Sequence, residues 1–204
     1  MISLRFLYLV TQQKRLPEGG IGCLECLQTL FIADFENLED MQGLKSLRKL
    51  VIFKCDTLIS LPRGIKCLTT LEELFIINCE KFDLMTIEEE KEEKIQPLSP
   101  SFRIVLFAMV PATIALPDQL FQGFAESLQT FIIRDCPNIR EMSECINNLK
   151  KLQNLEIIDC PRLSKRCIRG TGEYWPKIKH ITKIKVDNDD SGEEISYQVR
   201  VMSS

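Results

Sequence analysis

The sequence predicts an α/β fold of the solenoid type. Short stacked repeats would form a curved, horseshoe-like arc with a parallel β-sheet on its concave face and irregular or short-helical returns on its convex face. Two observations predict it: an apolar motif recurs with fixed internal offsets, and the distance between its copies suits one strand and one return. The four clearest copies are Leu47-x-x-Leu50-x-Ile52-x-x-Cys55, Leu71-x-x-Leu74-x-Ile76-x-x-Cys79, Leu128-x-x-Phe131-x-Ile133-x-x-Cys136 and Leu152-x-x-Leu155-x-Ile157-x-x-Cys160.

Three weaker copies keep the same offsets of 0, 3, 5 and 8, counted from the first apolar residue of the motif; they begin at Leu4, Leu27 and Phe102. The repeats therefore start near residues 4, 27, 47, 71, 102, 128 and 152, and this is the pattern of leucine-rich repeats. One repeat cannot bury its own apolar face, so stacked neighbours bury it together. We expect a single leucine-rich-repeat domain over residues 1–182, with seven parallel strands.

The returns are expected to be extended turns with short helices, because a Leu-Pro dipeptide interrupts regular structure in several of them. These dipeptides are Leu16-Pro17, Leu61-Pro62 and Leu116-Pro117. The return after the fourth strand carries a charged insertion near residues 83–100. It is interpreted as a solvated loop on the convex side or rim, with a partner-binding acidic loop as the alternative.

The two ends of the repeat array are expected to differ. The first repeat starts almost at Met1, so its strand would have an uncovered apolar edge. At the other end, residues 164–182 are expected to cap the last repeat through Trp175, Ile178 and Ile181. Residues 183–204 are expected to form an acidic, flexible tail.

Composition narrows the classes of function. The net charge of −3 over 204 residues argues against nucleic acid as the main partner. The longest apolar run, residues 104–110, is far too short to span a membrane. The single histidine, His180, has no nucleophile motif near it, and residues 170–173 do not match a phosphate-binding loop. We therefore expect no enzyme activity, no catalytic residue and no cofactor.

The nine cysteines follow the repeat and not the spacing of a metal site. Cys55, Cys79, Cys136 and Cys160 stand at offset 8, where a side chain points into the turn after the strand and helps to satisfy backbone groups. Cys23-x-x-Cys26 has no second pair at zinc spacing, so no metal site is expected. Abundant free thiols suit a reducing compartment. Because a signal peptide and glycosylation sequons are also missing from the sequence, a cytoplasmic location is expected.

The candidate binding site is the concave face. Residues at offsets 4 and 6 point away from the core, and these two columns are nearly all apolar on a face that should meet solvent, which is typical of an interface. Strand propensity alone is the alternative explanation for the branched residues. Charged rim residues, among them Asp34 and Lys54, would orient the partner. The predicted partner-binding residues are Tyr8, Phe31, Phe53, Phe75, Val51, Ile77, Leu106, Ile132, Arg134, Lys49 and Glu73.

Three stretches carry a family resemblance. They are Ser60-Leu61-Pro62 leading into the repeat that ends at Cys79, the repeat endings Asp135-Cys136-Pro137 and Asp159-Cys160-Pro161-x-Leu163, and the closing segment Arg166-Cys167-x-x-Gly170-Thr171-Gly172-Glu173-x-Trp175-Pro176-Lys177-Ile178-x-His180-Ile181. In these stretches the chain resembles the C-terminal repeats of plant nucleotide-binding leucine-rich-repeat disease resistance proteins of the coiled-coil class. Tyr174 and Thr182 depart from the family pattern, and the nucleotide-binding motifs are missing from this chain.

The resemblance implies a protein–protein recognition module of a plant intracellular immune receptor. Its partners would be a pathogen effector, a guarded host protein, or the nucleotide-binding domain of the same receptor, which such repeats hold inactive. The alternative is a substrate-recruiting arm of a ubiquitin ligase, which an F-box helix ahead of the repeats would identify. An extracellular receptor domain is a third class, which cap disulfides and a transmembrane helix would support.

Overall fold

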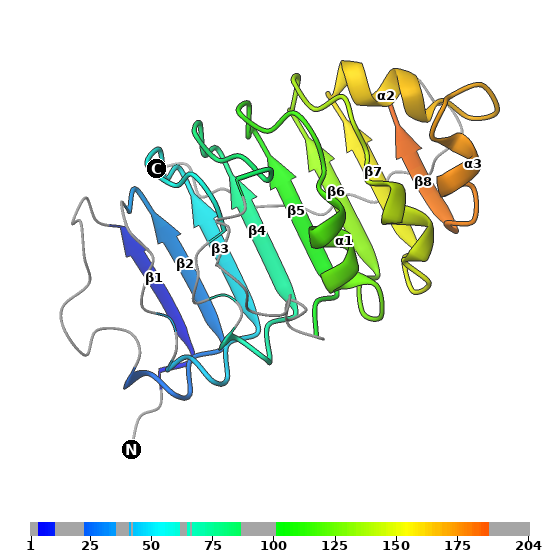
Figure 1. Cartoon of the computed structure of the whole chain (residues 1–204). Coiled ribbons are helices and arrows are strands. Elements are labelled where there is room, and N and C mark those ends of the chain that lie inside the picture. Colours follow the sequence, from blue (N-terminus) through cyan, green and yellow to red (C-terminus); the bar gives the residue numbers. More distant parts are fainter. Residues whose placement is uncertain are drawn as a thin grey trace, which may run out of the picture.

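The computed structural model describes residues 4–10, 23–35, 41, 43–61, 65, 67–86 and 101–187. In these ranges one sheet of eight strands runs in chain order, and every strand is parallel to its neighbours (Figure 1). The strands are β1 (Phe6–Val10), β2 (Thr29–Ala33), β3 (Lys49–Phe53), β4 (Glu73–Ile77), β5 (Ile104–Ala108), β6 (Thr130–Arg134), β7 (Asn154–Ile158) and β8 (Lys183–Val186). The leucine-rich-repeat solenoid predicted from the sequence is confirmed.

The predicted register is also confirmed. Each of the first seven strands runs from offset 2 to offset 6 of its repeat, and equal offsets pair across the sheet, as Leu50 pairs with Leu74 and Ile52 with Ile76. The side chains at offsets 3 and 5 point into the core and are fully buried from β2 to β7. Because the strands pair in parallel register, each of these side chains packs against the side chain at the same offset in the next strand. The core is therefore continuous along the sheet.

The returns close the core from the other side. Four short helical segments lie in the described returns: α1 (Asp118–Phe124), the 3-10 helix η3 (Glu144–Asn148), α2 (Pro161–Cys167) and α3 (Trp175–Ile178). In Figure 1, α1 lies over one face of the sheet. Phe121 of this helix packs edge to face against Phe131 of β6, with ring centroids 5.3 Å apart. The return face thus buries the apolar side of every strand that it covers.

A left-handed residue follows each strand from β2 to β7. It stands at offset 7, and its φ lies between 51° and 55° in Asp34, Lys54, Asn78, Met109, Asp135 and Asp159. Asn and Asp tolerate this region best. The turn lets the offset-7 N–H donate to the offset-6 carbonyl of the next repeat, as from Asn78 to Ala108 at 2.9 Å. The hydrogen-bond ladder therefore extends one residue beyond the strands.

The cysteines at offset 8 behave as the sequence predicts. Cys55, Cys79, Cys136 and Cys160 are buried, and each thiol lies 3.0–3.5 Å from the carbonyl oxygen two residues earlier. The hydrogen bond with Cys55 and burial raise the pKa of the Cys79 thiol. The Cys160 thiol, hydrogen-bonded to Cys136 and buried, also has a raised pKa. The Cys79 and Cys160 thiols are therefore interpreted as structural hydrogen-bond donors.

The C-terminal end differs from the sequence-based expectation in one respect. Eight strands form the sheet where seven were expected, because Lys183–Val186 adds β8 in register with β7. Ile181, Ile184 and Val186 occupy offsets 0, 3 and 5 of an eighth repeat. The expected flexible tail therefore begins with a strand, and residues 188–204 lie outside the described residues. Of the charged insertion, residues 87–100 also lie outside them.

Residues 164–182, which were expected to cap the last repeat, form the connection from β7 to β8. Ile178 and Ile181 are buried, and Trp175 is partly buried against the core. Tyr174, a departure from the family pattern, is more deeply buried than Trp175, with the Arg166 guanidinium 4.5 Å from its ring centroid. Arg166 also binds both carboxylate oxygens of Glu173 at 2.8 Å, which is an ion pair within the closing segment.

Candidate functional site on the concave face

The concave face is the side of the sheet that carries offsets 4 and 6, opposite the returns. Its apolar side chains form a cluster separate from the main core, made of Ile77, Leu106, Ala108 and Ile132. Phe53 and Phe75 pack against this cluster. The two predicted columns thus exist as a continuous apolar surface across β3 to β6.

The exposure predicted for these columns is wrong over the middle of the sheet. Val51, Ile77, Leu106 and Ile132 are buried, with only 1% of Ile132 exposed. The reason is lateral packing, because strands in parallel register lie ~4.8 Å apart and bring equal offsets into contact. Phe31, Phe53 and Phe75 are half-buried. These side chains face away from the core and are nevertheless not free in solvent.

The accessible part of the surface lies at the N-terminal end. Tyr8 is 57% exposed, and Phe6 and Val10 on the same strand are also exposed. The Tyr8 ring stacks on Phe31 with centroids 4.4 Å apart and planes 21° apart. Phe31 in turn lies 6.1 Å from Phe53. Aromatic rings from three adjacent strands therefore form one ordered, partly accessible row, which we call the aromatic row.

The charged residues expected at the rim pair with one another. Lys49 binds Glu73 at 2.8 Å, and Lys54 lies 3.7 Å from Asp34. The Lys49 ammonium also lies 4.5 Å from the centroid of the Phe75 ring, in cation–π geometry. Lys49 and Glu73 thus border the apolar surface as a neutral pair, and not as isolated charges.

Arg134 and Glu156 form an ion pair at the other end of the concave face. The Arg134 guanidinium lies 2.5 Å from the Glu156 carboxylate, and only 4% of Glu156 is exposed. The Arg134 Nε atom is buried and has no hydrogen-bond partner among the described residues. Because a buried carboxylate needs a partner, this pair is interpreted first as structural support between β6 and β7.

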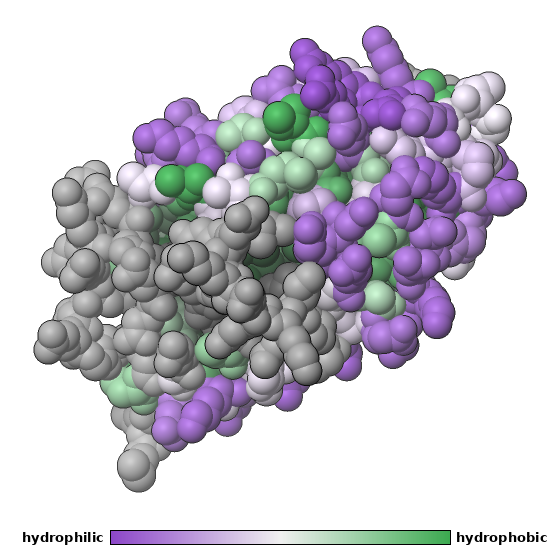
Figure 2. All heavy atoms as spheres, in the orientation of Figure 1, coloured by the Kyte–Doolittle hydropathy of each residue, from purple (hydrophilic) through white to green (hydrophobic). Residues whose placement is uncertain are grey.

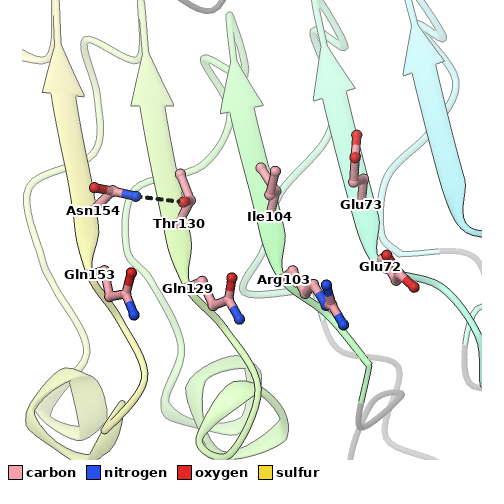
Figure 3. A pocket seen from close by; sticks show the side chains of 8 residues that line it. All are labelled: Glu72, Glu73, Arg103, Ile104, Gln129, Thr130, Gln153 and Asn154. Atoms are coloured by element: carbon pink, nitrogen blue, oxygen red, sulfur yellow. Dashed lines mark hydrogen bonds between the residues drawn. The ribbon is translucent and has the colours of Figure 1, made fainter. Parts of the chain in front are cut away.

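A polar pocket of about 320 Å³ lies at the amino ends of β4 to β7, and sequence reasoning missed it (Figure 3). Offsets 1 and 2 of four repeats line it. The signal in the sequence was present: these two positions are polar in nearly every repeat, next to the apolar columns. The lining residues are Glu72, Glu73, Arg103, Ile104, Gln129, Thr130, Gln153 and Asn154.

Figure 2 shows the surface in the orientation of Figure 1, with hydrophilic side chains dominant toward the C-terminal end and small hydrophobic areas between them. Within the described ranges, no group of three His, Cys, Asp or Glu side chains is placed to hold a metal ion. In the same ranges, no helix has the length and apolar character needed to cross a membrane.

Comparison with known proteins supports the fold. No family model matches the sequence, and no curated protein matches it. Among solved structures, the leucine-rich repeat domain of the type III effector XopL is similar, with a TM-score of 0.62 and 20% sequence identity. The match covers 90% of this chain and 69% of that one. At this sequence identity the likeness establishes a leucine-rich-repeat solenoid fold. It does not establish a function.

Proposed function

We propose that this chain is the protein-recognition module of a plant intracellular immune receptor of the nucleotide-binding leucine-rich-repeat class, and that it acts by binding and not by catalysis. The partner is a pathogen effector, a guarded host protein, or the nucleotide-binding domain of the receptor. The aromatic row carries the proposal, because ordered aromatic side chains that remain accessible are typical anchors of protein interfaces.

Two further features support this function. The motifs shared with the receptor family extend over most of the repeats and the closing segment. The apolar surface is bordered by the paired charges of Lys49 with Glu73 and Lys54 with Asp34. Paired rim charges contribute little to affinity but favour one orientation of a partner. We place the chain in the cytoplasm on the same grounds as the receptor family.

The first experiment concerns the transcript. Sequencing the reading frame around this chain reveals whether a nucleotide-binding domain is encoded with it. That domain is then expressed in plant leaf tissue together with the separate repeat chain, and cell death is scored. The unmodified chain should suppress the cell death caused by the free nucleotide-binding domain.

The decisive variant is the double change Tyr8→Ser and Phe31→Ser, which removes the stacked pair. The matched control is Ile59→Ser with Ile114→Ser, two exposed apolar residues outside the concave face. The first variant should lose suppression and binding in co-immunoprecipitation, while the control keeps both. Equal suppression by the two variants, at equal expression, would contradict a role for the aromatic row.

A further inference from the structure

The polar pocket is built by the repeat itself. Offset-1 residues Glu72, Arg103, Gln129 and Gln153 form its outer row, and offset-2 residues Glu73, Ile104, Thr130 and Asn154 form its inner row (Figure 3). The inner-row residues pair directly in the sheet ladder, as Ile104 pairs with Thr130 and Thr130 with Asn154. A regular row of different polar groups therefore lies beside the apolar columns of the concave face.

The backbone under this row is already satisfied. Each offset-1 carbonyl accepts hydrogen bonds from the next repeat, as the Arg103 carbonyl accepts the N–H groups of Gln129 and Thr130, both at 2.9 Å. The side chains of the outer row are consequently not needed to hold the strands together. Arg103, Gln129 and Gln153 remain available for a ligand, whereas Glu72 is paired with Arg48.

The charged side chains of the pocket differ in whether they have an ion-pair partner. Glu72 lies 3.3 Å from Arg48, and Glu73 lies 2.8 Å from Lys49, so both carboxylates have cationic partners on the β3 side. Arg103 is exposed, and its guanidinium has no ion-pair or hydrogen-bond partner among the described residues. The pocket therefore presents one unpaired cation, which favours a ligand carrying a carboxylate.

The remaining groups are amides. Asn154 donates to the Thr130 hydroxyl at 3.0 Å, whereas the exposed Gln129 and Gln153 amides make no side-chain hydrogen bond in the described part of the chain. A primary amide offers both donors and an acceptor, which matches a peptide group. Two such amides at successive strands suit the main chain of an extended peptide.

We propose that this pocket binds an extended segment of a partner protein that carries one acidic residue. Arg103 binds the Asp or Glu carboxylate in bidentate fashion, and Gln129 and Gln153 bind the peptide groups that follow it. Two strand spacings of ~4.8 Å separate Arg103 from Gln153, a span that about three extended residues cover. This inference rests on the proposed protein-recognition function and names the chemistry of the recognised segment.

The ion pairs next to Arg103 determine on which side of the acidic residue the rest of the bound peptide lies. Glu72 lies between Arg48 and Arg103 along the outer row and is paired with Arg48, so that side of the ligand meets an already neutralised pair and no second free cation. A polyanion such as nucleic acid would find one unpaired cation among the described pocket residues. A segment with a single acid and neutral residues toward β6 and β7 fits best.

The test is a display library of random eight-residue peptides, selected on the purified full chain. Enriched peptides should share one Asp or Glu at a fixed position, and synthetic copies should bind about 10- to 100-fold more weakly to Arg103→Gln. Arg162→Gln is the matched control, because Arg162 is also exposed but lies on α2. Arg103→Glu should invert the selection toward Lys or Arg. Circular dichroism establishes that each variant is folded.

The outcomes separate this inference from the function on which it rests. Peptides that bind Arg103→Gln as tightly as the original chain, or that lack an acidic residue, overturn the pocket assignment. If such peptides instead depend on Tyr8 and Phe31, protein recognition survives and the pocket assignment fails. Competition by inorganic phosphate or by an oligonucleotide at the affinity of the peptide also overturns it. The absence of any enriched peptide counts against both.

Discussion

The edge strand β1 and the strand β7, which lies one strand in from the opposite edge, are built from the same motif and reach different degrees of burial. In β1, the inward residues Leu7 and Leu9 are only half-buried, although they occupy the offsets that are fully buried elsewhere. In β7, Leu155 and Ile157 are completely buried, since β8 pairs beside them and α2 packs against β7. The motif determines the direction in which a side chain points. The neighbouring repeats determine how much of its surface is shielded from solvent.

The largest expected effect compares the offset-3 leucines of β1 and β7. Leu155→Ala and Leu7→Ala remove the same atoms at the same offset. The change at Leu155 should lower the free energy of unfolding by about 2–5 kcal/mol, while the change at Leu7 should cost about 1 kcal/mol because half of its burial is missing. Urea denaturation followed by circular dichroism measures both. Equal losses in the free energy of unfolding would mean that β1 and β7 are equally well packed.

A second pair of changes examines how the closing segment fits. A Cβ on Gly172 would lie 2.5 Å from the Arg166 carbonyl oxygen, closer than any packed side chain tolerates. Gly172→Ala should therefore lower stability by about 1–3 kcal/mol. Gly170→Ala is the control: its φ of +79° is strained for alanine, but nothing lies within 4 Å, so about 1 kcal/mol is expected. A larger loss at Gly170, measured by thermal unfolding, would point to backbone strain as the dominant cost.

Asp187 completes the last turn of the array. Its carboxylate accepts hydrogen bonds from the Asp159 and Cys160 N–H groups at 2.9 and 3.2 Å, and from the Ser164 hydroxyl at 2.9 Å. In the preceding repeats, a carbonyl of the next strand accepts the offset-7 N–H. Asp187→Ala should cost about 1–2 kcal/mol, and Asp187→Asn should cost less because one acceptor oxygen remains. Denaturant titration of the two variants would contradict this role if they lose equal stability.

The smallest perturbation uses the native cysteines as reporters. Cys26 and Cys67 are exposed and should react quickly with iodoacetamide in the folded chain. Cys160 and Cys167 should react slowly, because burial raises the pKa of Cys167 to about 12 and Cys160 has a raised pKa as well. Cys55 lies nearer the less buried edge strand β1 and should therefore be modified before Cys160 through local opening. Time-resolved labelling followed by mass spectrometry measures these rates. Equal labelling rates for Cys55 and Cys160 would refute the expected difference in local opening.

Much of the fold could be predicted because the informative residues lie close together in sequence. Leu71, Leu74 and Ile76 fix the strand and its inward face within six positions, and this logic gave all of the first seven strands. β8 was missed because it follows the longer capping segment, although Ile181, Ile184 and Val186 keep the offsets.

The site was less predictable for a physical reason. The direction of Leu106 and Ile132 follows from the pleat, but their burial depends on side chains of other repeats. The polar pocket is a stronger case, since Arg103, Gln129 and Gln153 are ordinary surface residues taken singly. They form a surface only because the register stacks them.

Constant register with variable returns has an evolutionary consequence. The repeat that starts at residue 27 extends 20 residues to the next start at 47, and the one at 71 extends 31 residues to 102, yet the strands pair at equal offsets in both cases. Insertions can therefore accumulate in a return without moving the neighbouring strands. Lineages can change the outer rim and the concave face independently, so new partner specificity need not disturb an older contact on the other surface.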